Sequence, residues 1–195
     1  MSVNVLNRLQ EKFGGKILET HSDHGDDTAV IDPKAWKEVA LALRNDPAFD
    51  FDMLTDLCGV DYPSRTPRFE VVVHLYSIGR RHRIRIKTRV GNEEGEDAVV
   101  DSLISVWRGA DWLEREAWDL MGIRFEGHPD LRRILMYEGF EGHPLRKDYP
   151  AQKTQPLIEY RTEEEAGVPL QKQAPFRDDE GMPFGRNVFT KTEEA

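Results

Sequence analysis

Three carboxylates and a guanidinium lie close together in Glu114-Arg115-Glu116 and Asp119. Neighbouring carboxylates can supply the general acid and base of a hydrolase. They can also form a charged helix face that makes ion pairs with Arg115 and with a partner protein, and charge runs on helices are usually of this second kind. We therefore interpret these residues as structural or interfacial, with Arg115 and Asp119 spaced to pair at i, i+4.

Two histidines and two acids near the N-terminus have the residue types of a metal site: His21, His24, Asp26 and Asp27. A bound metal ion needs several ligands at fixed geometry, and a flexible polar loop rarely supplies them. The spacing is a weak indication, and ordinary loop polarity is the preferred interpretation.

The pentapeptide Phe-Glu-Gly-His-Pro occurs twice, at 125–129 and 140–144. Glycine lets the backbone turn, and proline keeps the histidine before it extended. In such turns the two histidines, at 128 and 143, more often make a structural hydrogen bond than act as acid or base near pH 7. We predict that residues 131–135 between the turns form a short strand, whose Arg132 and Arg133 recognise carboxylates of another protein.

The composition argues against several classes of function. The 195 residues have a formal net charge of −9, which repels nucleic-acid phosphates and anionic lipid headgroups. An iron–sulfur cluster usually takes four thiolates, whereas the one cysteine is Cys58. We expect Cys58 to be a small buried hydrophobe rather than a nucleophile. No Gly-x-Gly-x-x-Gly or Walker loop occurs to bind NADH or another nucleotide.

The elements that must position these residues follow from the spacing of apolar side chains. Residues 5–13 have helical spacing and end at two glycines, which predicts a helix. Residues 16–19 are expected to form a strand that leads into a polar loop at 21–27. Asp32 is placed to cap a second helix over 33–45, which has proline at its first position.

Two stretches rich in β-branched residues, 69–78 and 81–90, are separated by a short turn and predict an antiparallel hairpin. The second stretch alternates, so that its arginines and lysine share one face. We expect this cationic face to meet acidic residues of a neighbouring subunit, or Glu70 of the hairpin itself, rather than phosphate or nucleic acid.

Two further helices are predicted, over 99–107 and over 111–122. Asp111 and Glu114 have the spacing of a capping box at the start of the second one, and Gly122 is a natural left-handed terminator. The apolar residues of that helix define one face and leave its charged residues on the others. Helices mixed with antiparallel strands predict an α+β fold, a mixed or antiparallel sheet packed with helices on one face.

The character of the chain changes after Pro150. Residues 151–195 contain four prolines and three scattered phenylalanines without sustained periodicity, so this segment cannot build its own core. A solvated tail and a tail that wraps over a partner, with the aromatic residues as anchors, both fit this composition. We divide the chain into an α+β domain at 1–150 and an extended, partner-wrapping tail at 151–195.

The segment 114–150 resembles the signature of the 30 kDa subunit family of respiratory complex I, the C subunit of NADH-quinone oxidoreductase. The order of elements over 1–150 is similar to that family as well, whereas the tail carries no diagnostic motif. The matching residues are Glu114-Arg115-Glu116, Asp119-Leu120-Met121, His128, Arg132, Ile134-Leu135 and the run from Gly142 to Pro150.

This resemblance implies a non-catalytic structural subunit of the peripheral arm, packed against the D subunit of complex I near the quinone site. Cluster-bearing subunits such as B and I would be its neighbours, and FMN and the iron–sulfur clusters would lie in partner subunits. No catalytic, cofactor-binding or metal-binding residue is implied in this chain. The residues expected at subunit interfaces are Glu114, Arg115, Glu116, Asp119, His128, Arg132, Arg133, His143, Arg146, Lys147 and Asp148.

Membrane association is expected only through the complex, on the cytoplasmic side of the inner membrane. The first ten residues lack the apolar core of a signal peptide, and no stretch approaches the about 20 apolar residues of a membrane-spanning helix. Two alternative functions stay open. One is the equivalent subunit of a membrane-bound nickel–iron hydrogenase or formate hydrogenlyase, and the other is a stand-alone metal-dependent hydrolase built on the histidines and carboxylates above.

Overall fold

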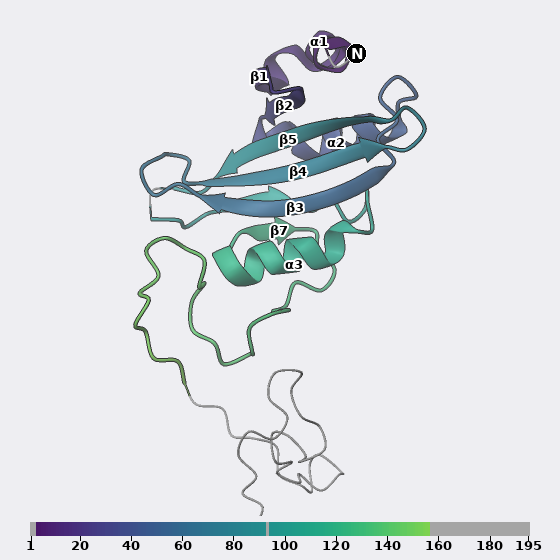
Figure 1. Ribbon diagram of the computed structural model, residues 1–195. Helices are drawn as coiled ribbons and strands as arrows, with labels where there is room; N and C mark the ends of the chain where they lie inside the picture. Colours follow the sequence, from purple (N-terminus) through teal and green to yellow (C-terminus); the bar gives the residue numbers. More distant parts are fainter. Residues whose placement is uncertain (1–2, 93, 157–195) are drawn as a thin grey trace, which may run out of the picture. The chain divides into compact units, whose positions relative to one another are not determined.

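The computed structural model describes residues 3–92 and 94–156 (Figure 1). The helices in these ranges are α1 (Val3–Phe13), α2 (Trp36–Asn45) and α3 (Ala110–Met121). Short 3₁₀ turns at Gly14–Lys16 and Pro33–Ala35 precede β1 and α2. The strands are β1 (Ile17–Asp23), β2 (Asp26–Ile31), β3 (Met53–Asp61), β4 (Phe69–Ser77), β5 (His82–Val90), β6 (Val99–Asp101) and β7 (Arg124–Glu126).

The main sheet of the described residues has the strand order β1-β2-β5-β4-β3. Its neighbouring strands are antiparallel except β2 and β5, which run parallel. Strands β6 and β7 form a separate parallel pair. The predicted fold class, an α+β domain with a mixed sheet packed with helices, is confirmed. The division at residue 150 stays a prediction, because most of the proposed tail lies outside the described residues.

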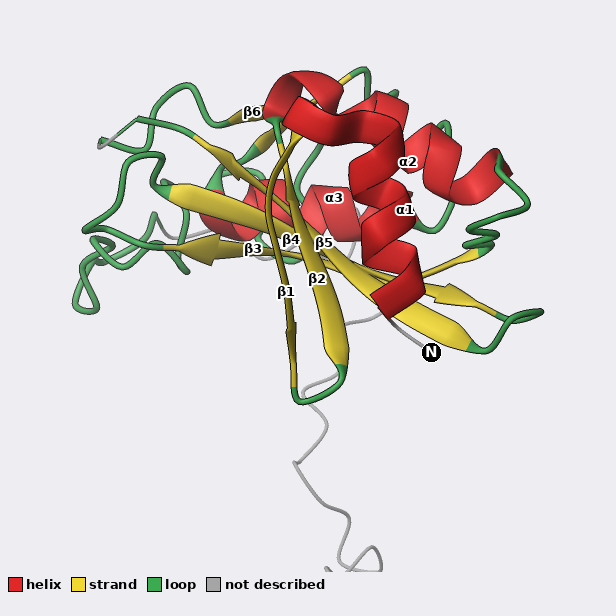
Figure 2. Cartoon of the chain, turned by 90° about the horizontal axis from the view of Figure 1, so that it is seen from above, coloured by secondary structure: helices red, strands yellow, loops and turns green. Residues whose placement is uncertain are grey.

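One face of the sheet shares an apolar core with the helices. Along β5 the side chains alternate as predicted, with Ile84 and Ile86 buried and Arg83 and Arg85 on the other face. Helix α2 covers the core with an apolar side that includes the fully buried Trp36. Figure 2 shows α1 and α2 on the same side of the strands. The opposite face, toward the viewer in Figure 1, is covered by no helix of the described residues.

Residues 21–27 form a β-hairpin rather than the predicted polar loop. Strands β1 and β2 pair up to Asp23 and Asp26, and His24 and Gly25 between them have φ values of 55° and 86°. Positive φ at both central residues gives a turn that matches the right-handed twist of the strands. The hairpin escaped prediction because a histidine stands where such turns usually have Asn, Asp or Gly.

The helix predicted over 99–107 is wrong. Its first residues form β6, which pairs with β7, and Leu103 and Trp107 enter the core from the turns that follow. Glu114 accepts hydrogen bonds from the hydroxyl of Ser102 and the backbone N–H of Leu103. These tertiary bonds hold the start of the stretch, and the turn that follows keeps local backbone bonds from the N–H groups of Val106 and Trp107 to the Leu103 carbonyl. No element was predicted for β3, which lies at an edge of the sheet next to α3.

Gly59 in β3 marks a close approach between the sheet and the end of α3. A Cβ added here would lie 2.8 Å from Cδ1 of Ile123 and 2.9 Å from Sδ of Met121. We predict that Gly59→Val lowers the free energy of unfolding by about 1–3 kcal/mol, because the added atoms overfill this space. Urea denaturation followed by tryptophan fluorescence measures the change.

Gly109→Ala is the matched control. Gly109 has φ −64° and no atom within 4 Å of an added Cβ, so the substitution should change stability by less than about 1 kcal/mol in either direction. Equal losses in the two variants would contradict the packing argument.

Candidate functional site

Helix α3 begins the segment that the sequence singled out, and its Glu114 points into the protein. The side chain is fully buried, and its two oxygens accept the 2.6 Å hydrogen bonds from Ser102 Oγ and the Leu103 N–H. Burial raises the pKa of Glu114, and these two bonds only partly offset that effect. The predicted capping box is wrong, because the residue at the helix N-cap is Gly109 and it makes no side-chain cap bond.

Asp119 is the second buried carboxylate of α3. Its Oδ2 accepts hydrogen bonds from the backbone N–H groups of Ile134, Leu135 and Met136, at 3.0, 2.8 and 2.8 Å. Its Oδ1 accepts a 2.6 Å bond from Arg133 Nη1. Burial acts to raise the pKa of Asp119, but these four bonds outweigh it and hold the pKa below its ordinary value.

Arg133 links Asp119 to the second Phe-Glu-Gly-His-Pro turn. Its Nη2 donates to the carbonyls of Phe140 and Gly142 at 2.9 and 3.0 Å, and its guanidinium lies near the rings of Trp118 and Phe140. Arg133 is therefore bonded inside the chain. Residues 131–135 form no strand, so that prediction is wrong.

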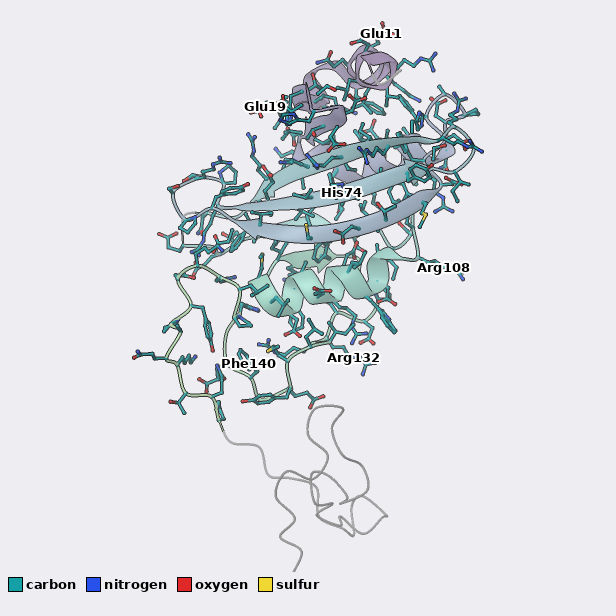
Figure 3. The ribbon with its side chains drawn as sticks, in the orientation of Figure 1. Glu11, Glu19, His74, Arg108, Arg132 and Phe140 are labelled. Atoms are coloured by element: carbon teal, nitrogen blue, oxygen red, sulfur yellow. The ribbon has the colours of Figure 1, made fainter. Side chains whose placement is uncertain are left out.

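Arg115 holds the same loop from the helix side. Its guanidinium donates to the carbonyls of Arg132 and Arg133, each at 3.1 Å. The predicted i, i+4 pair with Asp119 is wrong, because Asp119 is occupied by Arg133 and three amides. Arg132 itself points to solvent and pairs with Asp130 at 2.9 Å. Figure 3 labels Arg132 and Phe140 on the segment that follows α3.

Both histidines of the repeated pentapeptide make structural hydrogen bonds, as predicted. His128 Nδ1 accepts from the Asp130 N–H at 3.1 Å, so in the neutral ring Nε2 carries the proton and donates to the Asp111 carbonyl at 3.2 Å. His143 Nδ1 donates to the Asp119 carbonyl at 2.9 Å. Burial lowers the pKa of His143.

The end of the segment is anchored on the sheet through Asp61 of β3. Arg68 donates to both oxygens of Asp61, at 2.7 and 2.8 Å, and to Asp148. The backbone N–H of Lys147 bonds Asp61 Oδ2 at 2.7 Å. Burial acts to raise the pKa of Asp61, but Arg68 and the Lys147 amide lower it on balance. Arg146 donates to the Met121 carbonyl at 2.7 Å and lies over a sheet phenylalanine.

Sequence reasoning missed Asp61, Arg68 and Ser102. None of them belongs to a motif, and each bonds a residue that is distant in the sequence or expected to face solvent. Glu114, Asp119 and Arg133 were expected at a subunit interface, but they bond within the chain. The interface assignment stays a prediction for all eleven residues, of which Glu116, Arg132, Lys147 and Asp148 are exposed.

The histidine and acid cluster near the N-terminus is used for local bonds. His21 contacts Asp23, Asp27 accepts from a serine hydroxyl, and Asp26 pairs with two arginines of β5. Over residues 3–92 and 94–156, no three His, Cys, Asp or Glu side chains are grouped to hold a metal ion.

The cationic face of β5 forms ion pairs with acidic residues of its own chain. This agrees with the expectation that it meets Glu70 of the hairpin. Glu70 receives Lys87 at 2.8 Å and Arg89 at 3.4 Å, and Arg89 also pairs with Glu19. Cys58 is exposed rather than buried, which corrects the prediction. Partial burial and the neighbouring carboxylate of Asp56 raise the pKa of its thiol.

Sequence comparison gives consistent matches. The model of the family described as "Respiratory-chain NADH dehydrogenase, 30 Kd subunit" matches residues 29–155. The second C subunit of NADH-quinone oxidoreductase from Rhizobium etli is 51% identical, covering 74% of this chain and 76% of the relative. The C subunit of the same enzyme from Xanthobacter autotrophicus is 49% identical, covering 78% of this chain and 70% of the relative.

Solved structures agree with the sequence matches. Nqo5, in its trypsin-resistant fragment 1–134, has a TM-score of 0.56 and 31% identity, covering 67% of this chain and 100% of that one. A chain of the membrane-bound sulfane sulfur reductase, an archaeal respiratory membrane complex, has a TM-score of 0.65 and covers 76% of this chain and 85% of its own. At 18% identity, the second match shows a shared fold alone.

The fold is that of a small α+β domain, which this chain shares with Nqo5 and with a chain of the sulfane sulfur reductase. The sequence matches make the assignment specific: the chain belongs to the 30 kDa subunit family of respiratory-chain NADH dehydrogenase, the family of the C subunit. It is a subunit of a multisubunit complex of the complex I type. These findings favour that function over the hydrogenase and hydrolase alternatives.

Removing Arg133 should destabilise the domain. We predict that Arg133→Met lowers the free energy of unfolding by about 3 kcal/mol, the lower end for a broken buried pair, because three amides still bind Asp119. Arg132→Met is the matched control and should stay within about 1 kcal/mol, because its ion pair with Asp130 is exposed. Urea denaturation of the full chain measures both. Equal effects would contradict the assignment of Arg133 to the fold.

Asp119 should also make the domain acid-sensitive. Its pKa is lower in the folded than in the unfolded state, so the ionised carboxylate stabilises the fold above about pH 4. That contribution is lost as the pH falls through the folded pKa. We predict a smaller loss of stability between about pH 5 and pH 2 in Asp119→Asn than in the wild type, measured by urea denaturation at a series of pH values. An unchanged acid dependence would rule out Asp119 as a source of the effect.

Proposed function

We propose that this chain is a non-catalytic structural subunit of the peripheral arm of proton-translocating NADH:quinone oxidoreductase. In this proposal it packs against the D subunit near the quinone site and has no active site of its own. FMN and the iron–sulfur clusters belong to partner subunits, and cluster-bearing subunits such as B and I are its neighbours. The chain lies on the cytoplasmic side of the inner membrane and is held there through the complex.

The observation that carries the proposal is the inward direction of two carboxylates of α3. Glu114 and Asp119 are fully buried, and each is bonded to donors of its own chain. A carboxylate that acts as acid or base must reach a substrate directly or through one water molecule. These two are instead placed to hold the loops on either side of α3, so their chemistry supports a structural role.

The number of cysteines supports the proposal that this chain holds no iron–sulfur cluster. One cysteine is available in the whole sequence, and a cluster usually takes four thiolates. A rigid subunit can still be essential to the chemistry, because a site in a partner keeps its geometry only when its supporting shell is fixed. Among the described residues, no helix is both long enough and apolar enough to cross a bilayer.

Affinity purification of the tagged full chain from native membranes tests this proposal. We expect the D subunit as a stoichiometric partner, identified by mass spectrometry, together with FMN and NADH-oxidising activity in the purified complex. The full chain produced alone should show no flavin or iron–sulfur absorbance and should not oxidise NADH. A stoichiometric cofactor in the chain alone, or a purified complex that lacks the D subunit, would overturn the proposal.

A further inference from the structure

Three large apolar side chains remain exposed around the outer side of α3. Trp112 is 69% exposed, Leu135 is 57% exposed and Leu145 is 49% exposed. An exposed tryptophan on a helix is unusual, because most of its large surface is apolar. Exposed apolar patches on folded proteins often mark sites of protein–protein contact.

These side chains lie on one face of α3 or at its borders. Trp112, Glu116 and Leu120 are spaced i, i+4 and i+8, so they lie on the same side of α3 over about 12 Å of its length. The backbone of Leu135 lies next to α3, because its N–H bonds Asp119 of that helix. Leu145 lies at its far end, where its N–H bonds the Leu120 carbonyl at 3.0 Å. We refer to these five residues as the α3 stripe.

Hydrogen bonds within the chain hold the backbone beside the α3 stripe. Asp119 fixes the backbone of residues 134–136, and Arg115 holds residues 132–133 from the helix. A preformed surface loses little conformational entropy on association, which favours affinity. The inward-bonded charges of the same segment therefore build the platform on which the apolar side chains are presented.

Glu116 gives the stripe a specific electrostatic requirement. It is exposed between the apolar positions and makes no ion pair with the described residues. A carboxylate covered by an apolar partner loses its hydration, and a cation brought by the partner complements its charge. The complementary surface is therefore apolar with one lysine or arginine placed opposite Glu116.

We propose that the α3 stripe is a docking surface for an amphipathic segment of another subunit of the same complex. Trp112 inserts into an apolar pocket of that segment, and a basic side chain pairs with Glu116. This inference rests on the proposed function, since it places the contact within the assembled complex. Tryptophan is typical of the few interface residues that carry most of the binding energy.

Two other exposed apolar side chains provide internal controls. Ile78 is 59% exposed after β4, and Leu18 is 52% exposed in β1. Leu18 lies in the edge strand on the opposite side of the sheet from β3, and Ile78 lies in the turn between β4 and β5. Neither residue belongs to the α3 stripe. Their exposed fractions are similar to that of Leu135. Substitutions at these two positions therefore show whether a defect in assembly comes from the α3 stripe or from the loss of any exposed apolar side chain.

Photo-crosslinking in the assembled complex tests the docking surface directly. A benzophenone amino acid replaces Trp112 in the tagged full chain, and in a second variant it replaces Ile78. After irradiation of the purified complex, we expect the probe at 112 to link to another subunit, within a segment that is apolar and contains a lysine or arginine. The probe at 78 should give no link to that segment.

Substitutions measure how much the contact contributes. Trp112→Ala should weaken incorporation into the complex about 30-fold, and Glu116→Lys should weaken it as well, by repelling the basic residue. Leu18→Ser and Ile78→Ser should leave the amount of assembled complex on native gels unchanged. The melting temperature of each full-length variant, measured alone, should stay at the wild-type value, because all four positions are exposed.

The outcomes separate this inference from the proposed function. If the wild-type chain is recovered with the D subunit but Trp112→Ala assembles normally, the docking surface is wrong and the structural role stands. Links from position 112 only to a second copy or to residues 157–195 of this chain would also overturn the docking surface. If the wild-type chain is recovered without the complex, both proposals fail.

Discussion

The structure of the signature segment depends on one buried carboxylate. An ionised group in the protein interior is costly unless its oxygens are bonded to donors. Asp119 meets this condition with three consecutive backbone N–H groups and the guanidinium of Arg133. These donors come from a stretch without helix or strand, so a single side chain gives an irregular loop a defined path. Arg133 then extends the same order to the turn at Gly142.

A second carboxylate, Asp61, fixes the other end of that path to the sheet. It binds Arg68 and the amide of Lys147, while Arg146 bonds the last turn of α3. The density of charged residues that makes the segment recognisable thus has a physical origin inside the chain. Within this one segment the bonded charges set the shape of the backbone, and the proposed docking surface is made by side chains that this shape leaves outside.

Strict periodicity made part of the fold predictable. The alternation of β5 and the apolar side of α2 depend on local spacing, and both are present in the structure. Tertiary bonds decided the rest. Glu114 was assigned to an exposed face because charged side chains usually meet water, but Ser102 and Leu103 supply bonds that make its burial tolerable. No local pattern could reveal that Asp61 binds an amide 86 residues away.

The spacing of the Asp61 contacts has a consequence for biosynthesis. Arg68 is seven residues from Asp61, whereas Asp148 is 80 residues from Arg68. At ribosomal rates of about 5–20 residues per second, the two sides of the second pair leave the ribosome about 4–16 s apart. Arg68 therefore has one carboxylate partner, Asp61, encoded seven residues away before the second partner, Asp148, has been synthesised. The short-range pair can neutralise Arg68 during that interval, and the segment that contains Asp148 then joins an ion pair that is already formed.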